Sequence, residues 1–439
     1  MSITNLQNKI QNRSAKIAQI GLGYVGLPVA CMFAKVGFET IGVDVDQKRI
    51  ATVNAGENPI EGIEPGLAEL IAEVVAGGKL RCTTDYSELS DTDIIIIAVQ
   101  TPVEDDTHQP RYQHMQSALH SLGLALKDGA LVVVESTIAP GTMHNVIIPA
   151  LEASSGKKAG TGFYVGHCPE RVMPGRLLHN IQNMDRVIGG FDPDTAATMK
   201  ILYENIVNGT LDTTDLLTAE LVKTTENAYR DVQIAFANEV ARVCEALGGD
   251  VWKVRELVNK SPGRNMLYPG AGVGGHCIPK DPWLLISRIR DEVVPQLIPM
   301  ARQVNRSMPQ HVLQLTQDAL SEAGVDPAKA IVAVLGYAYL ENSDDTRDTP
   351  SQFYLQAAEP IFGEIRVHDP FVAPYQADLD TILEGVDVAV ILVAHDEYRQ
   401  MDWDAALETM RTPALVDARN VLKKVPSRNA HIRILGKGH

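Results

Sequence analysis

The sequence predicts an α/β protein in which two doubly wound parallel-sheet domains are joined by a long central helix and a helical connector. Short apolar runs of strand length alternate with helical patterns through the first half of the chain, as they do in parallel sheets. A helical pattern without Gly or Pro then runs from about 211 to 247, and the alternation begins again near residue 330. The 439 residues suit two or three domains of roughly 150 residues each.

The composition excludes several classes of protein. Lys+Arg number 39 against 55 Asp+Glu, and the net charge of −16 argues against non-specific binding to nucleic acid or acidic membranes. No apolar run approaches the ~18–20 residues of a membrane span, and residues 1–16 lack the apolar core of a signal peptide. The cysteines show no CxxC or Cys/His metal spacing, so we expect a reduced cytoplasmic protein without a metal site. They are Cys31, Cys82, Cys168, Cys244 and Cys277.

The first elements form a strand–turn–helix–strand unit. An apolar run at 17–20 leads into the glycine-rich turn at 21–26, a helical pattern follows at 27–36, and a second apolar run at 40–43 ends at Asp44. This order is typical of the Rossmann-like βαβ unit. Further buried strands are expected at 93–99 and 130–135, each bounded by turn residues.

The glycine-rich turn predicts a dinucleotide site. Gly21 permits the tight turn, Gly23 lets the backbone approach a pyrophosphate, and Gly26 packs the helix against the strand, while the helix N-terminus stabilises the anion. Asp44 would accept hydrogen bonds from ribose hydroxyls and repel a 2′-phosphate, which favours NAD over NADP.

The second half of the chain predicts a helical domain and a second sheet. Apolar residues recur at three- and four-residue spacing from Leu216 to Val243, and helices of this length often connect domains or form dimer interfaces. Strand patterns follow a further helical stretch. The expected strands lie at 330–335, 365–368, 386–393 and 414–416. The predicted division is a dinucleotide-binding domain at 1–210, a helical dimerisation domain at 211–320 and a C-terminal α/β domain at 321–439.

A single cysteine lies in a glycine-rich loop, Gly270-Ala-Gly-Val-Gly-Gly-His-Cys-Ile-Pro-Lys-Asp281. The glycines leave Cys277 open to a substrate, and cationic neighbours such as Lys280 increase the thiolate fraction. The other four cysteines have the surroundings of core residues. We therefore identify Cys277 as a nucleophile. With NAD, such a thiol can trap an aldehyde as a thiohemiacetal, which is oxidised to a thioester and hydrolysed to an acid.

These motifs in this order resemble the UDP-glucose/GDP-mannose dehydrogenase family. The resemblance extends from Gly21 to Arg419 and implies oxidation of the C6 hydroxyl of a nucleotide sugar to a carboxylate, with two NAD+ per product. The motifs that carry it are GLGYVGLP at 21–28, Thr101-Pro102, EST at 135–137, PGT at 140–142, CPER at 168–171, Glu220, Lys223, Asn227, Asn238, Glu239, GVGGHCIPKD at 272–281, SDDTR at 343–347 and VDARN at 416–420.

The resemblance implies a role for each catalytic residue. Cys277 corresponds to the nucleophile. Lys223 resembles the lysine that stabilises developing oxyanions, and Asn227 lies four residues on, on the same helical face. Asp281 resembles a carboxylate that helps to activate a water or base. Thr137 and Glu170 resemble the residues that hold water and assist thioester hydrolysis.

The resemblance also implies the binding residues. Arg264 matches an arginine that reaches the substrate from the neighbouring subunit, which implies a homodimer or a dimer-based oligomer. The expected NAD contacts are Gly21, Gly23, Tyr24, Val25, Gly26, Asp44, Thr101, Thr137, Lys280 and Arg347. The expected contacts to the UDP-sugar are Glu170, Arg171, Val172, Lys223, Asn227, Arg230, Arg264, Gly274 and His276.

Local sequence bears on the identity of the sugar. Arg171, Arg230 and His276 offer donors for an acetamido oxygen, and their surroundings resemble the branch that acts on UDP-N-acetylmannosamine. Lys280, in contrast, is the residue of glucose-type members, and Leu340 stands where many members have a lysine. The favoured substrate is UDP-N-acetyl-D-mannosamine, for polysaccharide or glycan precursor synthesis. The alternatives are UDP-N-acetylglucosamine, UDP-N-acetylgalactosamine and UDP-glucose.

Two other classes of protein remain as alternatives. A two-electron hydroxyacid dehydrogenase shares the dinucleotide domain and the long helix, but it has no use for a cysteine in a glycine-rich loop. A non-catalytic module that binds NAD and a nucleotide sugar would be expected to lose Cys277, Lys223 or Glu170, and all three are present.

Overall fold

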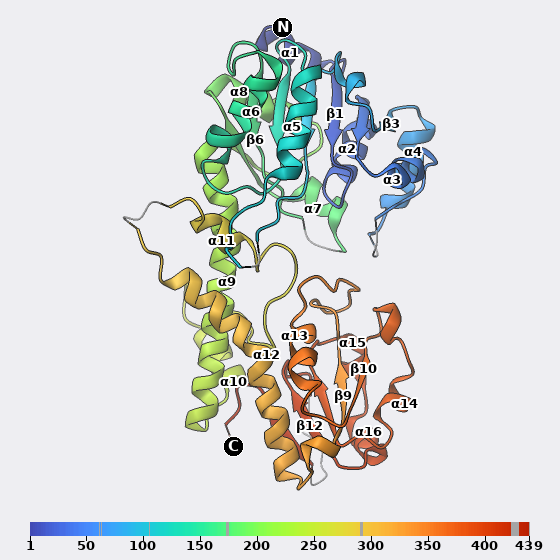
Figure 1. The fold of residues 1–439 in the computed structure, drawn as a ribbon, viewed down its shortest axis with the longest axis vertical. Helices are drawn as coiled ribbons and strands as arrows, with labels where there is room; N and C mark the ends of the chain where they lie inside the picture. The colour runs from blue at the N-terminus through green and yellow to red at the C-terminus, as the bar shows by residue number, and fades with distance from the viewer. Residues whose placement is uncertain are drawn as a thin grey trace. The chain divides into compact units, whose positions relative to one another are not determined.

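The computed structural model describes residues 1–60, 62, 64–104, 106–172, 175–289, 293–422 and 430–438. The chain forms two compact units. The first comprises Met1–Glu226 and Trp283–Val293, and the second comprises Asn227–Pro282 and Val294–His439. Each unit contains one sheet with helices on both faces (Figure 1), so the predicted α/β class is confirmed.

The sheet of the first unit has eight strands in the order β3-β2-β1-β4-β5-β6-β7-β8. All neighbours pair in parallel except β6 and β7, which are antiparallel with Gly166 opposite Gly190. The first six strands therefore follow the doubly wound order, and β7–β8 extend it. The strands are β1 (Lys16–Ile20), β2 (Glu39–Val43), β3 (Leu80–Thr83), β4 (Ile94–Ile97), β5 (Leu131–Val134), β6 (Tyr164–His167), β7 (Arg186–Gly190) and β8 (Leu211–Asp215).

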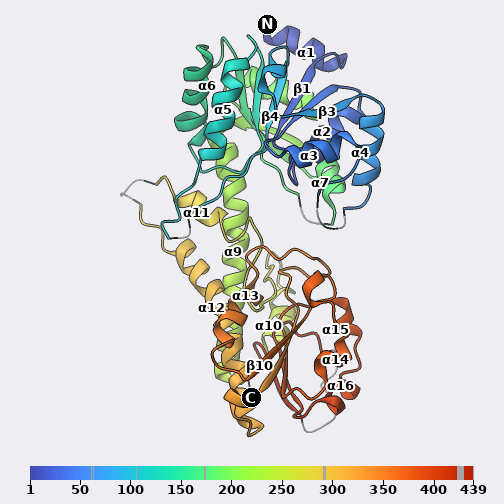
Figure 2. The ribbon, with the colours of Figure 1, turned by 45° about the vertical axis from the view of Figure 1, so that its right-hand side comes forward.

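The central strands are apolar along their whole length because helices cover both faces of the sheet. Strand β4 consists of four isoleucines, all fully buried. Figure 2 shows α5 and α6 on one side of the sheet and α2, α3 and α4 on the other, and two separate apolar clusters form the core on the two sides. The helices are α1 (Ile3–Gln11), α2 (Gly26–Lys35), α3 (Gln47–Asn54), α4 (Leu67–Ala76), α5 (Gln113–Ala125), α6 (Ile148–Ser155), α7 (Leu177–Asn183) and α8 (Pro193–Tyr203).

The long helix α9 runs from Leu216 to Leu247 and has 32 residues. The sequence pattern predicted helix from about 211, but residues 211–215 form the edge strand β8, which pairs with β7. Pairing with β7 therefore makes residues 211–215 a strand, although their local pattern predicts a helix. The other helices of the middle section are α10 (Val251–Val258), α11 (Asp281–Ile286) and α12 (Leu297–Glu322). Among the described helices, none is long and apolar enough to cross a membrane.

The sheet of the second unit has five parallel strands in the order β10-β9-β11-β12-β13. The order reverses between β9 and β11, and in open α/β sheets ligands bind at the carboxyl ends of the strands at such a point. Apolar clusters lie on both faces of this sheet. The strands are β9 (Ile331–Leu335), β10 (Glu364–His368), β11 (Val388–Ile391), β12 (Ala414–Asp417) and β13 (His431–Ile434), and the helices are α13 (Pro350–Ala358), α14 (Leu379–Leu383), α15 (Asp396–Gln400) and α16 (Trp403–Thr409).

Candidate active site

The glycine-rich turn of the first unit lies between β1 and α2. Gly21 has φ +87°, and a Cβ there would lie 2.5 Å from the carbonyl oxygen of Ala98. A Cβ at Gly26 would lie 2.0 Å from the Gly21 oxygen, whereas a Cβ at Gly23 would meet nothing within 4 Å. Two glycines are thus required for packing, and the third leaves open space beside the backbone. Helix α2 has no side-chain N-cap, so its first N–H groups suit a pyrophosphate.

The acidic residue after β2 is held beside this turn. Asp44 is 9% exposed. Its Oδ2 accepts hydrogen bonds from the Leu22 N–H at 2.8 Å and from Arg49 at 3.2 Å, and its Oδ1 accepts from the Asp46 N–H at 3.0 Å. The carboxylate is therefore fixed at the end of β2, where it can meet a ribose. The turn and Asp44 together fit an NAD+ molecule.

Four further predicted cofactor contacts belong to the same unit. The Thr101 hydroxyl donates to the carbonyl oxygen of Thr137 at 2.6 Å, which joins the loops after β4 and β5. Tyr24 donates its hydroxyl hydrogen to Glu64. Val25 packs against the apolar cluster beside α2. These residues line one edge of the sheet, at the carboxyl ends of its strands.

Helix α9 contributes a buried carboxylate and a largely buried lysine to the first unit. The carboxylate of Glu220 accepts hydrogen bonds from the N–H groups of Gly141 and Met143, both at 2.7 Å. Lys223 is only 8% exposed, and no ion pair of its ammonium group is found among the described residues. Burial, together with the nearby Lys223 charge, lowers the pKa of His167 to about 4. Burial of a charge without a partner costs free energy in the folded state. Lys223 is therefore suited to bind a group that carries or develops a negative charge.

Glu170 is buried at the end of β6, with 6% exposed surface. Its Oε1 accepts a hydrogen bond from the Arg171 N–H at 2.7 Å, and its Oε2 lies 2.6 Å from Nη2 of Arg186. The guanidinium group of Arg171 donates to the carbonyl oxygen of Asp185 and pairs with Glu226. Arg171, which we expected to donate hydrogen bonds to the sugar, therefore already donates to these two residues. Val172 is half-buried against the apolar cluster beside α2.

Arg186 joins Glu170 to a second carboxylate that sequence reasoning missed. Nη1 of Arg186 lies 3.4 Å from Oε1 of Glu135, which also accepts a hydrogen bond from the Tyr203 hydroxyl at 2.8 Å. Burial, opposed by Arg186 and reinforced by the charge of Glu170, raises the pKa of Glu135 to about 7. No local pattern identifies this cluster, because its members come from separate strands and a helix.

The raised pKa of Glu135 makes stability depend on pH. The carboxyl group releases its proton near its ordinary pKa of 4.5 in the unfolded chain but near 7 in the folded protein. Its contribution to the free energy of unfolding is therefore present below about pH 4.5 and falls by about 3 kcal/mol as the pH rises to about 7. Urea unfolding of the wild type and of Glu135→Gln between pH 4.5 and 7.5 measures how the free energy of unfolding changes with pH. We expect the wild type to lose stability relative to the variant across this range, and a constant difference would contradict the assignment.

In the second unit, Cys277 is exposed, whereas the other four cysteines are buried. Burial raises the pKa values of Cys31, Cys82 and Cys168 to about 12, so these thiols are inert at neutral pH. The carbonyl oxygen of Cys277 accepts hydrogen bonds from the N–H groups of Lys280 at 3.1 Å and Asp281 at 2.8 Å. This turn presents the thiol at the start of α11.

The segment after β9 packs so closely against the loop before Cys277 that the loop requires glycines there. Gly275 has φ +87°, and its N–H donates to the carbonyl oxygen of Arg347 at 2.8 Å. A Cβ at Gly275 would lie 2.9 Å from the ring of Tyr339, and one at Gly274 would lie 2.6 Å from the Tyr339 Cβ. The backbone of the cysteine loop therefore packs against the Tyr339 side chain of the segment 336–349, and residues larger than glycine do not fit at 274 and 275.

Three of the predicted residues meet at Asp281. Its carboxylate is fully buried, and Oδ2 accepts a hydrogen bond from the Asn227 side chain at 2.6 Å. Oδ1 lies 3.6 Å from Nζ of Lys280, which is itself 7% exposed. Asp281 thus orients an amide on α9 and an ammonium group beside Cys277.

Four further predicted residues occupy the surface or the loop rim. Desolvation and the nearby charges of Lys280 and Arg347 lower the pKa of His276 to about 4, so its imidazole is neutral at pH 7. Arg347 pairs with Asp345 at 2.5 Å. Arg230 and Arg264 are exposed, and Nη1 of Arg264 donates to the carbonyl oxygen of Pro262 at 2.9 Å.

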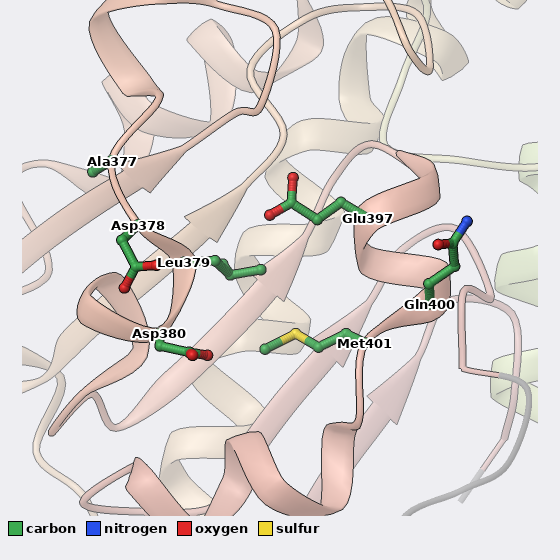
Figure 3. A pocket seen from close by; sticks show the side chains of 7 residues that line it. All are labelled: Ala377, Asp378, Leu379, Asp380, Glu397, Gln400 and Met401. Atoms are coloured by element: carbon green, nitrogen blue, oxygen red, sulfur yellow. The ribbon is translucent and has the colours of Figure 1, made fainter.

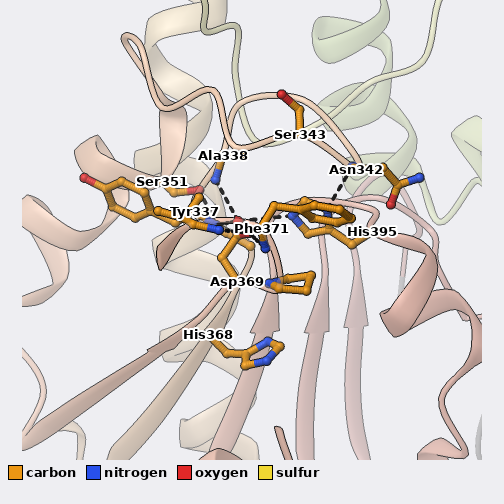
Figure 4. Close-up of polar contacts among 12 residues, drawn as sticks. Tyr337, Ala338, Asn342, Ser343, Ser351, His368, Asp369, Phe371 and His395 are labelled. Carbon is orange, nitrogen blue, oxygen red and sulfur yellow. Dashed lines mark hydrogen bonds and ion pairs between the residues drawn. The ribbon is translucent and has the colours of Figure 1, made fainter. Parts of the chain in front are cut away.

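A second cluster that the sequence did not indicate closes the turn after β9 (Figure 4). Oδ2 of Asp369 accepts hydrogen bonds from the N–H groups of Tyr337 at 2.7 Å and Ala338 at 2.9 Å, and lies 3.1 Å from Nε2 of His395. The N–H of Asn342 donates to Nδ1 of the same imidazole at 2.9 Å. Asp369 follows β10 as Asp44 follows β2, and this correspondence could have identified it.

A cavity of about 390 Å³ lies elsewhere on the second unit, lined by α14, α15 and neighbouring residues (Figure 3). Asp378, Asp380 and Glu397 give it three carboxylates. Such a lining repels phosphate groups, so the cavity does not suit a nucleotide. No cluster of metal-ligating side chains occurs in the part of the chain that the structure describes.

Family models and known proteins match almost the whole chain. The models of the UDP-glucose/GDP-mannose dehydrogenase family match in order: the NAD binding domain at 15–207, the central domain at 217–307 and the UDP binding domain at 333–424. UDP-N-acetyl-D-mannosamine dehydrogenase of Pyrococcus horikoshii is 39% identical, over 94% of this chain and 97% of its own length.

Solved structures agree with these matches. The structure of UDP-D-ManNAc dehydrogenase from Pyrococcus horikoshii superposes with a TM-score of 0.91 and 38% identity, covering 96% of this chain and 99% of the other. NDP-N-acetyl-D-galactosaminuronic acid dehydrogenase from Methanosarcina mazei gives a TM-score of 0.87 and 36% identity, covering 100% and 98%.

Proposed function

Since the chain belongs to the UDP-glucose/GDP-mannose dehydrogenase family, we propose that it oxidises the C6 hydroxyl of a UDP-N-acetylhexosamine to the uronate, with UDP-N-acetyl-D-mannosamine as the favoured substrate. The family makes the chain an NAD-dependent nucleotide-sugar dehydrogenase. The observation that carries the four-electron reaction is the single exposed thiol, Cys277, in its glycine-rich loop. NAD+, when bound, accepts one hydride in each of the two oxidations.

In the first oxidation the chain must stabilise a developing alkoxide. Lys223, buried and without an ion pair among the described residues, supplies the positive charge. Asn227, held by Asp281 at 2.6 Å, supplies an oriented amide donor one turn further along α9. The product of this step is an aldehyde.

In the second half of the reaction the Cys277 sulfur attacks the aldehyde carbon. Oxidation of the resulting thiohemiacetal gives a thioester on the protein. Water then attacks the thioester carbonyl, the C–S bond breaks, and the uronate leaves. Glu170 and Thr137 hold this water, and Glu170 takes its proton.

The preference for an acetamido sugar has two supports. Relatives of this chain act on UDP-N-acetyl-D-mannosamine and on an NDP-N-acetyl-D-galactosaminuronic acid, as their names state. In this chain, neutral His276 offers one N–H donor, and Arg230 is exposed on α9. Arg171 is engaged with Glu226, so we assign recognition of the acetamido group to His276 and Arg230.

NADH release measures both the reaction and the sugar. Purified protein is mixed with limiting UDP-sugars, and NADH is counted per sugar at completion. We expect two NADH per UDP-N-acetyl-D-mannosamine and little from UDP-glucose. One NADH per sugar would contradict the role of Cys277. Two NADH from another UDP-sugar would keep the chemistry and change only the roles of His276 and Arg230.

We propose that the protein acts as a homodimer, with domains at 1–210, 211–320 and 321–439. Helix α9 exposes a row of large apolar side chains spaced by seven and four residues, as expected of a helix that packs against a partner. These are Tyr229 (62% exposed), Phe236 (58%), Val243 (49%) and Leu247 (80%). Arg264 would reach the sugar nucleotide of the partner subunit.

Arg264→Ala tests this shared site. We expect kcat/KM for the sugar nucleotide to fall by about tenfold to a hundredfold, because a charge-assisted contact to the substrate is lost. Sedimentation should still show a dimer, and NAD+ affinity should be unchanged. A wild-type monomer with full activity would contradict the shared site.

A further inference from the structure

Arg186 is a buried cation that the reaction steps above do not use. It lies on β7, and 1% of its surface is exposed. Its guanidinium group lies between two carboxylates, with Nη2 at 2.6 Å from Glu170 and Nη1 at 3.4 Å from Glu135. A bridge of this kind fixes the separation and orientation of the two acids.

The guanidinium group has two further neighbours, on α7 and α8, whereas its Nε has no hydrogen-bond partner. Nη2 donates to the carbonyl oxygen of Ile181 at 3.2 Å, and the guanidinium carbon lies 5.2 Å from the ring centre of Tyr203. The Tyr203 hydroxyl donates to Glu135 at 2.8 Å. Arg186 therefore has one orientation, set by β7, α7 and α8, and cannot follow Glu170 if that side chain moves.

Glu170 is the member of this cluster that retains an exposed edge, of 6%. One of its oxygens is paired with Arg186, and the other accepts the Arg171 N–H at 2.7 Å. A carboxylate oxygen has two lone pairs, so the second oxygen can still accept a hydrogen bond from a water. The ion pair decides the direction in which that lone pair points.

We propose that Arg186, held at its other end by Glu135, is a positioning residue for thioester hydrolysis, because it fixes the Glu170 carboxylate against the attacking water. This inference rests on the proposed function, in which Glu170 receives the proton of that water as the C–S bond breaks. Both hydride transfers precede this step, so a loose Glu170 slows the release of the uronate and not the formation of NADH within the first turnover.

Arg186→Lys is the first test, because lysine keeps the charge but lacks the planar fork of donors that fixes the orientation of two carboxylates. We expect a pre-steady-state burst of two NADH per active site at near wild-type rate. The steady-state rate should fall by about tenfold to a hundredfold, as for a misplaced catalytic group. Intact-protein mass spectrometry after acid quench should show a covalent adduct on Cys277.

Arg302→Lys is the matched control. Arg302 is 3% exposed and pairs with Asp231 at 2.6 Å, so the same substitution disturbs an equally buried ion pair in the other unit. We expect the ratio of burst rate to steady-state rate to stay at its wild-type value in this control. Equal slowing of both phases in Arg186→Lys, without an adduct, would show a merely structural role and overturn the proposal.

Glu135→Gln keeps the test decisive if Arg186→Lys does not fold. It releases one end of Arg186 while retaining side-chain shape, and we expect a smaller slowing of the steady state, about threefold to tenfold, with the same adduct. An unchanged ratio of the two phases in this variant would overturn the proposal. Failure of the proposed function is distinguishable, since the wild type would then release one NADH per sugar and Glu170→Gln would form no adduct.

Discussion

Replacement of Cys277 by serine is expected to leave a folded protein that binds NAD+ but forms no uronate. The thiol is the exposed cysteine of the chain, and its glycine-rich loop excludes larger neighbours. A serine hydroxyl is slightly smaller than the thiol and is a far weaker nucleophile at neutral pH, so neither the hemiacetal nor the ester forms. We expect uronate production to fall by about 10⁴-fold or more, with at most one NADH per sugar.

The measurement combines NADH stoichiometry with mass spectrometry of the sugar product. Cys244→Ser is the matched control, because Cys244 is buried and the substitution removes the same sulfur atom from a core position. The control should keep two NADH per sugar and lose only stability. Rapid formation of acid by Cys277→Ser would contradict the assignment of the nucleophile.

Replacement of Lys223 by methionine is expected to lower activity and raise stability together. Lys223 is 8% exposed, and no carboxylate pairs with its ammonium group among the described residues. Burial of an uncompensated charge costs free energy in the folded state, whereas methionine fills a similar volume without a charge. The same substitution removes the cation that stabilises the alkoxide, so we expect kcat/KM to fall by about a thousandfold.

Thermal unfolding and steady-state kinetics on one preparation test both effects. The melting temperature should rise by about 1 °C for a gain of about 1 kcal/mol, because the unfolding entropy of a chain of 439 residues is large. Lys35→Met at the exposed end of α2 is the control and should change neither quantity appreciably. A variant that loses stability along with activity would show that Lys223 has a partner in the folded protein and is a structural residue.

The sequence by itself determined the features that depend on neighbours along the chain. The glycine turn at 21–26, the strand before it and Asp44 after β2 are specified within one βαβ unit, because turn geometry and helix periodicity act over a few residues. The same holds for the end of α9 at Leu247 and for the loop around Cys277. In each case the physical constraint, a positive φ or an apolar face, is local.

Tertiary structure alone decided the features that depend on distant partners. Residues 211–215 carry a helical pattern, yet they form β8 because β7 offers an edge to pair with. Strands β6 and β13 likewise have short or mixed sequences that become strands only by pairing.

The functional site shows the same division. The sequence identifies Glu170 and Arg171 side by side, but only the fold engages Arg171 with Glu226 and brings Arg186 between Glu170 and Glu135. It also joins Asp369 to His395 across the sheet. Buried charges must find partners wherever the topology places them, and the order of residues along the chain does not reveal which partners those are.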